Sequence, residues 1–271
     1  MSILEALVLG VVQGLTEFLP VSSSAHLALV PELLGWGQPT LAYAVLLHAG
    51  TLLALFAYFR RELVATLQGM MRPGPARRFV VLLIAGTVPA AVIGVAFEEW
   101  FEDNFGRPFQ VALQLILTGL ILFGIEALAR RRPPPPADPQ DLTGLKSLVD
   151  DLNPAKAAAV GFAQAFAIIP GISRSGATIA AGLMAGLSRP QAARFSFLLS
   201  IPIVFGTTLF KVPDLAGEGT GAGPLAVGFL ASAVTGYVAI AGTIAFLQRR
   251  GLHVFAIYCV LAGSLTAFYL R

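Results

Sequence analysis

The residues most able to do chemistry in this chain stand in two short polar groups that interrupt apolar sequence. In the first group, Gln13 and Glu17 are four residues apart, so a helix would place both side chains on one face. Three serines follow soon after Pro20, and they are Ser22, Ser23 and Ser24. If a helix starts at these serines, Ser23 and His26 lie on the same face and could contact one ligand.

The second group is centred on Arg174, shortly after Pro170 and Gly171. Hydroxyl side chains accompany the arginine, and they are Ser173, Ser175 and Thr178. Arginine offers planar, multidentate donors that suit phosphate oxygens, and free amides at the start of a helix favour anions. The second group therefore predicts an anion-binding site.

Together, the two groups predict a site for a phosphorylated ligand that carries a lipid tail. A charged side chain in the middle of a membrane segment is costly, so Glu17 and Arg174 need a reason to be there. Glu17 would repel a phosphate unless a cation lies between them. Mg²⁺ or Ca²⁺, bound by one carboxylate plus phosphate oxygens, solves that problem, so we expect a divalent metal.

Each of these residues also has a structural explanation. Serine runs often cap helices or allow membrane helices to pack closely. Glu17 and Arg174 could form an ion pair that has no role in catalysis. His26 alone could be a buried histidine whose hydrogen bonds serve only the structure. His48, in the next apolar segment, has no evident partner in the sequence, so we expect it to be structural. The functional interpretation depends on the co-occurrence of these residue types at two breaks.

The composition indicates that lipid is the solvent for most of the chain. Of the 271 residues, 56% are hydrophobic and 12% are charged, and the mean hydropathy is +0.78, unlike an ordinary soluble domain. The basic residues sit in loops and do not alternate with aromatic residues, so we expect no nucleic-acid partner. A single cysteine, Cys259, excludes an internal disulfide and a cysteine-based metal cluster.

Six apolar segments are long enough to cross a hydrocarbon core of about 30 Å. They lie at 41–59, 79–97, 109–128, 191–210, 224–247 and 252–270. Residues 3–34 and 155–187 are also apolar, but proline and polar residues break each of them near the middle. Each half is too short to span, so we expect two re-entrant helical hairpins. Their tips should face inward, because irregular backbone at membrane depth needs protein or water around it.

Charged loops orient these segments, since short cytoplasmic loops are enriched in Lys and Arg. Arginines mark the loops near residues 60–78, 130–132 and 249–250. Acidic residues mark the alternate loops near 98–103 and 214–218. The first hairpin should then open outward and the second inward.

This alternation predicts an inverted repeat within one all-α integral membrane domain, residues 1–271. Residues 1–128 and 155–271 would each hold one hairpin and three spans. Because three is an odd number of membrane crossings, the second copy is inverted relative to the first. We expect residues 129–154, which include four consecutive prolines, to be a cytoplasmic linker.

The two polar groups closely resemble the signatures of a known family, the bacitracin-resistance family of undecaprenyl-diphosphate phosphatases. The matching runs are Gln13-Gly-Leu-Thr-Glu17-Phe-Leu-Pro20-Val-Ser-Ser-Ser24-Ala-His26 and Pro170-Gly-Ile-Ser173-Arg174-Ser-Gly-Ala-Thr178. The resemblance extends along most of the chain, apart from the proline-rich linker. The family's acidic motif begins with Glu or Gln, and Gln13 is the uncharged option, so metal binding should rest mainly on Glu17 with Gln13 as a weaker ligand.

The resemblance implies hydrolysis of undecaprenyl diphosphate to undecaprenyl phosphate and inorganic phosphate. It implies that the active site opens to the outer, periplasmic side of the bacterial plasma (inner) membrane. There the reaction would recycle the lipid carrier for peptidoglycan synthesis and confer bacitracin resistance. Partners would be the polyprenyl diphosphate lipid and membrane lipid, and the sequence leaves open whether the chain forms a homodimer.

From the two polar groups, we expect the catalytic residues to be Glu17, Ser23, His26 and Arg174. We expect the phosphate-binding residues to be Ser22, Ser24, Ser173, Arg174, Ser175 and Thr178. Attack on phosphorus could come from Ser23 with His26 as base, or from water activated by His26. The main rival is a transporter or flippase of a polyprenyl phosphate lipid, because inverted repeats with broken helices are typical of carriers.

Overall fold

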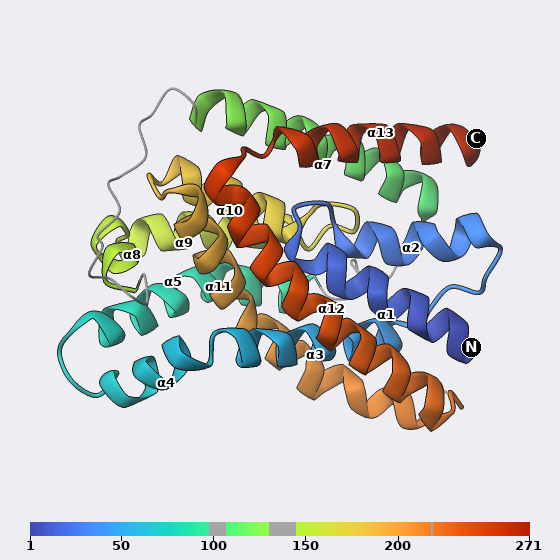
Figure 1. The fold of residues 1–271 in the computed structure, drawn as a ribbon, viewed down its shortest axis with the longest axis horizontal. Coiled ribbons are helices and arrows are strands. Elements are labelled where there is room, and N and C mark those ends of the chain that lie inside the picture. Colours follow the sequence, from blue (N-terminus) through green and yellow to red (C-terminus); the bar gives the residue numbers. More distant parts are fainter. Residues whose placement is uncertain (98–106, 130–144, 218) are drawn as a thin grey trace.

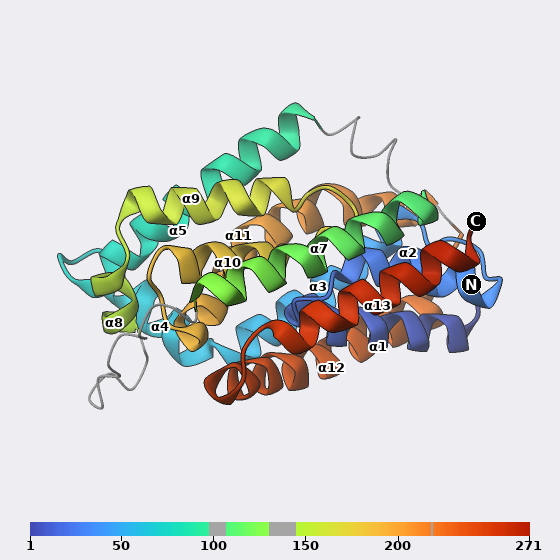
Figure 2. The ribbon, with the colours of Figure 1, turned by 90° about the horizontal axis from the view of Figure 1, so that it is seen from above.

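The computed structural model describes residues 1–97, 107–129, 145–217 and 219–271, and every regular element in these ranges is a helix. Most helices run along the long axis of the molecule (Figures 1 and 2). Five are long and apolar enough to cross a membrane: α3 (Leu41–Tyr58), α5 (Pro75–Ala96), α7 (Pro108–Ala129), α11 (Arg189–Lys211) and α12 (Ala222–Arg249). The structure therefore confirms the predicted all-α integral membrane protein.

The sixth predicted span forms α13 (His253–Tyr269), which is shorter than the other five. Its 17 residues extend about 25 Å at 1.5 Å per residue. It packs along α7, and the two helices lie side by side in both views (Figures 1 and 2). Five of the six predicted spans are thus confirmed as helices long enough to cross a membrane. The sixth, α13, is an apolar helix that is slightly shorter.

Three short helices were not predicted from the sequence. They are α4 (Arg60–Gly69), α8 (Leu145–Asp151) and the 3₁₀ helix η1 (Val212–Gly217). Helix α4 follows α3 after Phe59 alone, in the arginine-rich segment that the sequence analysis treated as a loop. Most of the predicted linker and the acidic segment near residues 98–103 lie outside the described residues.

The first predicted hairpin consists of α1 (Ile3–Phe18) and α2 (Ser23–Leu34). Ser22 caps α2, because its Oγ accepts a hydrogen bond from the N–H of Ala25 at 3.2 Å. The φ angle of Ser22 is +67°, and it is the one non-glycine residue with positive φ in the described part of the chain. Such a conformation is unfavourable for a residue with a Cβ atom, so the first tip is held in place by its surroundings.

The second predicted hairpin consists of α9 (Pro154–Phe166) and α10 (Arg174–Met184). Asn153 caps α9 by accepting from the N–H of Lys156 at 2.9 Å. At the tip, Gly171 has a φ of +93°, which glycine adopts without steric cost. Ser173 then caps α10, accepting from the N–H of Gly176 at 3.0 Å.

The two hairpins enter from opposite ends of the molecule and their tips meet near its middle. Figures 1 and 2 show α1 and α2 on the side of the chain termini, and α9 and α10 on the side of α4 and α8. Helix α1 packs against α12, and α9 packs against α5. The first helix of each hairpin therefore packs against the second span of the other predicted repeat. An inverted repeat predicts this reciprocal pairing, and the inversion across the membrane stays a prediction.

The outer face of the helical bundle is apolar. On α5, a row of large hydrophobic side chains is 46% to 77% exposed, and it comprises Val81, Ile84, Val88, Val92 and Val95. Large contiguous apolar surface of this kind is unusual on a soluble protein. In a membrane it contacts lipid, which agrees with the composition.

Candidate active site

Glu17 lies at the end of α1, is 4% exposed, and is surrounded by polar partners. Ser23 Oγ donates a hydrogen bond to Glu17 Oε2 at 2.5 Å, and Gln13 Nε2 donates to the same oxygen at 2.9 Å. His48 Nε2 lies 3.4 Å from that oxygen. Arg174 forms an ion pair with the other carboxylate oxygen. The predicted carboxylate, serine and arginine therefore meet at one point.

Polar contacts join the two hairpin tips directly. They are the Arg174–Glu17 ion pair, the hydrogen bond from Gly171 N–H to Ser24 Oγ at 3.2 Å, and the hydrogen bond from Ser175 Oγ to the Leu19 carbonyl at 2.9 Å. Each contact connects residues about 150 positions apart in the sequence. The two motifs therefore form one site.

The Arg174–Glu17 ion pair, weighed above as a structural alternative, is present in the structure. Only Nη2 of Arg174 contacts Glu17 among the described residues, and the arginine side chain is 19% exposed. A guanidinium carries five N–H donors, so the remaining donors can serve a second anion. The ion pair is compatible with phosphate binding by Arg174.

Ser23 and His26, which we expected to contact one ligand, do not contact each other among the described residues. Ser23 points to Glu17, whereas His26 Nδ1 lies 2.8 Å from the Ser22 carbonyl and Nε2 lies 2.7 Å from the Tyr258 hydroxyl. Both ring nitrogens of His26 thus have other partners. The structure places Glu17, and not His26, next to the Ser23 hydroxyl.

The predicted phosphate-binding hydroxyls of the second tip are buried and already have protein partners. Ser173 caps α10, and Ser175 bonds to the first tip. Thr178 Oγ1 donates to the Arg174 carbonyl at 2.7 Å and lies 2.6 Å from Ser196 Oγ on α11. These hydroxyls hold α10 in place, and Thr178 faces α11 instead of the first tip. Their contact with phosphate stays a prediction.

The hydroxyls of the first tip are also engaged. Ser22 is 2% exposed and caps α2, while Ser24 accepts from Gly171. Backbone amides remain for an anion. Among the described residues, the N–H groups of Ser23 and Ser24, and those of Arg174 and Ser175, have no acceptor. Two helix starts with free amides near an arginine favour an anionic ligand.

A sequence model of the family described as "Bacitracin resistance protein BacA" matches residues 6–265 of the chain. The chain belongs to this family. The match includes all residues of the candidate site and both hairpins except the first three residues of α1.

Several proteins named undecaprenyl-diphosphatase are similar to this member of the bacitracin-resistance family over nearly its full length. The one from Geobacter sulfurreducens is 45% identical over 281 residues, covering 100% of this chain and 99% of the relative. The one from Pelobacter propionicus is 44% identical over 275 residues, covering 97% and 96%. The one from Moorella thermoacetica is 42% identical over 276 residues, covering 100% of both chains.

The donor atoms of this family member's site fit a divalent metal that is also bound by substrate. Gln13 Oε1 is buried and has no hydrogen-bond partner among the described residues. It belongs to the side chain that contacts Glu17, and both residues offer the hard oxygen ligands that Mg²⁺ and Ca²⁺ prefer. The described part of the chain contains no cluster of three or more His, Cys, Asp or Glu residues that could hold a metal. The described residues therefore fit a metal whose coordination is completed by phosphate oxygens.

Sequence reasoning missed two residues that contact the predicted site. His48, expected to be structural, lies beside Glu17 and is 27% exposed. An ionisable residue in the middle of a membrane span is a functional candidate by default, and that signal could have identified it. Tyr258 contacts His26 from 232 positions away. A tyrosine in a membrane helix is common, so no sequence signal marks it.

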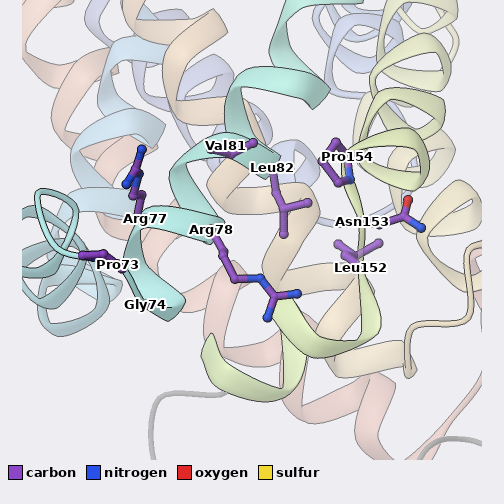
Figure 3. A pocket seen from close by; sticks show the side chains of 9 residues that line it. All are labelled: Pro73, Gly74, Arg77, Arg78, Val81, Leu82, Leu152, Asn153 and Pro154. Carbon is purple, nitrogen blue, oxygen red and sulfur yellow. The ribbon is translucent and has the colours of Figure 1, made fainter.

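Two hollows on the surface lie away from the hairpin tips. Figure 3 shows one, of about 390 Å³, where Arg78 and Leu82 of α5 lie across from Leu152. The other, of about 340 Å³, lies beside the ion pair between Glu126 and Arg189. Neither is lined by a tip residue, so the candidate site is defined by its polar contacts.

Proposed function

We infer that this chain hydrolyses undecaprenyl diphosphate to undecaprenyl phosphate and inorganic phosphate. Its relatives named undecaprenyl-diphosphatase share 42% to 45% identity with it and align over nearly the full length. The observation at the site that carries the inference is the contact of Ser23 and Arg174 with the same carboxylate, Glu17. A nucleophile, a proton acceptor and a phosphate-binding cation are thus adjacent.

We place the diphosphate between the two hairpin tips. The free N–H donors of Arg174 and the amides at the starts of α2 and α10 would bind the phosphate oxygens. Positioning and charge neutralisation of this kind supply most of the acceleration in phosphoryl transfer. The polyprenyl tail would leave sideways into the lipid, because the outer face of the bundle is apolar.

In the proposed reaction, Ser23 Oγ attacks the terminal phosphorus while its proton passes to Glu17 Oε2. A bond forms between Oγ and phosphorus, and the bond from that phosphorus to the bridging oxygen breaks. Undecaprenyl phosphate leaves with the electron pair on that oxygen. Water then attacks the phosphoserine phosphorus, and the bond between Oγ and phosphorus breaks as Glu17 returns its proton to Oγ. Inorganic phosphate leaves with the water oxygen and its hydrogens, and both the serine and the carboxylate are restored. Direct attack by water, with Ser23 only positioning the phosphate, is the second route.

We propose that Mg²⁺ or Ca²⁺ binds at the Glu17 carboxylate and Gln13 Oε1, together with phosphate oxygens of the substrate. When bound, the metal would neutralise negative charge between carboxylate and phosphate. This explains why an acidic residue can stand in a site for an anion. It also explains why the buried oxygen of Gln13 has no partner among the described residues.

We propose that the protein lies in the plasma membrane of a bacterium with its active site open to the outer side. The arginine-rich helix α4 lies at the same end of the molecule as α8 and the end of α12, and the chain termini lie at the other end (Figures 1 and 2). The positive-inside rule makes the arginine-rich end cytoplasmic. The first hairpin, with Glu17 and Ser23 near its tip, then opens outward.

A carrier of polyprenyl phosphate would need binding but no nucleophile. The named relatives do not favour it, although opposed broken helices also occur in carriers. The test is phosphate release from undecaprenyl diphosphate by the purified protein in detergent. The wild type is compared with Ser23→Ala and with Ser264→Ala, an exposed serine on α13 that serves as control.

We expect release by the wild type and by Ser264→Ala. For Ser23→Ala we expect a loss of at least about 1,000-fold, as for other nucleophilic serines. Near-normal release by Ser23→Ala would instead assign the attack to water. No release by the wild type with any divalent metal, while lipid is still bound, would contradict the phosphatase and favour the carrier.

A further inference from the structure

Helix α13 contacts the first hairpin tip through two consecutive residues. The Tyr258 hydroxyl lies 2.7 Å from His26 Nε2, and the two rings stack with centroids 5.7 Å apart and planes at 6°. The next residue, Cys259, donates from Sγ to the Pro20 carbonyl at 3.7 Å. The tip of the first repeat is therefore supported from the last helix of the chain.

These contacts fix the direction of both hydrogen bonds of the His26 ring. The Ser22 carbonyl can only accept, so Nδ1 must carry the hydrogen and donate to it at 2.8 Å. In the neutral ring Nε2 is then an acceptor, and the Tyr258 hydroxyl donates to it. Neither nitrogen faces Ser23, so the ring is in no position to take its proton.

The carbonyl that His26 holds belongs to the residue with the unusual backbone. Ser22 has a φ of +67°, which a non-glycine residue adopts only where its surroundings enforce it. Ser23 follows directly, and its Oγ points to Glu17 at 2.5 Å. The direction of the Ser23 side chain therefore depends on the conformation of Ser22. The Ser22 carbonyl accepts from the backbone N–H of His26 at 3.3 Å as well as from the ring, so the His26 ring is one of the groups that support that conformation.

The second tip has a comparable support from α7. Thr118 Oγ1 donates to the Gly171 carbonyl at 3.2 Å and accepts from the N–H of Ser173 at 3.1 Å. Each tip is thus bonded to the last span of the other predicted repeat. Tyr258 is therefore the counterpart of Thr118 at the first tip.

We propose that Tyr258 is a positioning residue for the reaction. Acting through His26, it holds Ser22 in its left-handed conformation and thereby aims Ser23 at Glu17. The proposal rests on the proposed phosphatase function and adds to it a residue from α13. In this arrangement His26 also positions the tip, and Glu17 accepts the proton.

The test starts from the full chain in detergent, with phosphate release from undecaprenyl diphosphate as the assay. If the wild type released no phosphate, the proposed function itself would fail. Given wild-type release, Tyr258→Phe is compared with Tyr269→Phe, the same change at a 68% exposed position on the same helix. We expect Tyr258→Phe to lower kcat about tenfold with KM within about twofold, as for loss of one positioning hydrogen bond. Tyr269→Phe should match the wild type.

Two further variants separate positioning from base catalysis. The side-chain amide in His26→Asn can still donate to the Ser22 carbonyl, so it should be clearly faster than His26→Ala. If Tyr258 acts only through His26, the double variant His26→Ala/Tyr258→Phe should be no slower than His26→Ala alone. A loss from Tyr258→Phe that persists in the His26→Ala background would overturn the proposal, as would His26→Asn being as slow as His26→Ala.

A spectroscopic measurement tests the same contact without activity. The chain has three histidines, so ¹⁵N-histidine NMR of the detergent-solubilised protein can resolve the His26 ring. We expect a ring protonated at Nδ1 in the wild type, and in Tyr258→Phe a shift of the Nε2 resonance with no change at the other two histidines. An unchanged Nε2 resonance, or a Tyr258→Phe enzyme as fast as the wild type, would overturn the proposal.

Discussion

At the scale of single residues, the site is built around one buried carboxylate, Glu17, whose negative charge is balanced by neighbouring donors. Glu17 interacts with Arg174 through one oxygen and with Ser23 and Gln13 through the other. Removing one partner of a buried ion pair typically costs about 3 to 5 kcal/mol, because it leaves an uncompensated charge. Bound phosphate would take part of the Arg174 interaction away from Glu17. A divalent cation could then balance the charge of the carboxylate.

Changing Gln13 to Glu tests the proposed metal site. Two adjacent buried carboxylates repel each other unless a cation lies between them. We therefore expect Gln13→Glu to lower the thermal unfolding midpoint in EDTA and to show a larger Mg²⁺-dependent increase of that midpoint than the wild type. The measurement is thermal unfolding over a Mg²⁺ titration, with Gln13→Met as the variant that lacks the oxygen. Equal Mg²⁺ responses in all three proteins would contradict metal binding at Gln13.

The sequence indicated which polar residues could meet, but not the contacts that each of them makes. Glu17 and Arg174 stand out because charges within apolar segments are costly, and the structure brings them together. The Thr178 contact could not be predicted, because the rotation of α10 that turns its hydroxyl to Ser196 is set by packing on α11. Tyr258 reaches the site from 232 positions away, and no local pattern encodes that contact.

At the scale of elements, each hairpin is held by a close helix contact through glycine. A Cβ atom on Gly14 of α1 would lie 2.6 Å from the Ser232 carbonyl of α12. A Cβ atom on Gly161 of α9 would lie 2.9 Å from the carbonyl carbon of Gly86 of α5. Small residues at such contacts let membrane helices approach closely. The hairpin tips can meet because these contacts fix the positions of α1 and α9.

Replacing Gly14 with Ala tests the importance of the α1–α12 contact. The added methyl group would overlap backbone and side-chain atoms of α12, so we expect a destabilisation of about 1 to 3 kcal/mol and weaker phosphate release. Gly242→Ala is the control, because nothing lies within 4 Å of an added Cβ atom there. Thermal unfolding in detergent measures both variants. Equal midpoints for Gly14→Ala and Gly242→Ala would show that α1 is not held by this contact.

The long helices were predictable because lipid imposes a simple length requirement on apolar segments. The predicted segment 41–59 ends one residue after α3, and the predicted segment 109–128 is one residue shorter than α7 at each end. The short helices α4 and α8 carry no such requirement. They have 10 and 7 residues, so no membrane-spanning length marks them in the sequence.

At the scale of the whole molecule, two hairpins from opposite ends create a polar site in the middle of an apolar bundle. Gln13 and Glu17 are 0% and 4% exposed in a chain that is 56% hydrophobic. Irregular backbone at this depth is tolerated because the two tips satisfy each other's polar groups. A site within the membrane suits a substrate whose head is a diphosphate and whose tail is a lipid.

Cysteine accessibility tests the proposed inverted arrangement. Gly37 lies at the open end of the first hairpin and Ala155 at the start of α9, the open end of the second. We expect Gly37→Cys to react with a membrane-impermeant maleimide in spheroplasts, and Ala155→Cys to react only after the membrane is opened. The native Cys259 is 0% exposed and should give little background. Labelling of both cysteines from the same side would contradict the inverted repeat.

The most direct test of the site is the rate of phosphate release by Glu17→Gln. This variant keeps the shape of the side chain but removes the charge that contacts Ser23 and Arg174. Glu126→Gln is the matched control, since Glu126 is also buried and paired with an arginine, Arg189, but stands apart from the tips. We expect Glu17→Gln to lower kcat by at least about 100-fold, and folded Glu126→Gln to keep near-normal turnover. Near-normal release by Glu17→Gln would contradict the assignment of the active site to the meeting point of the two hairpins.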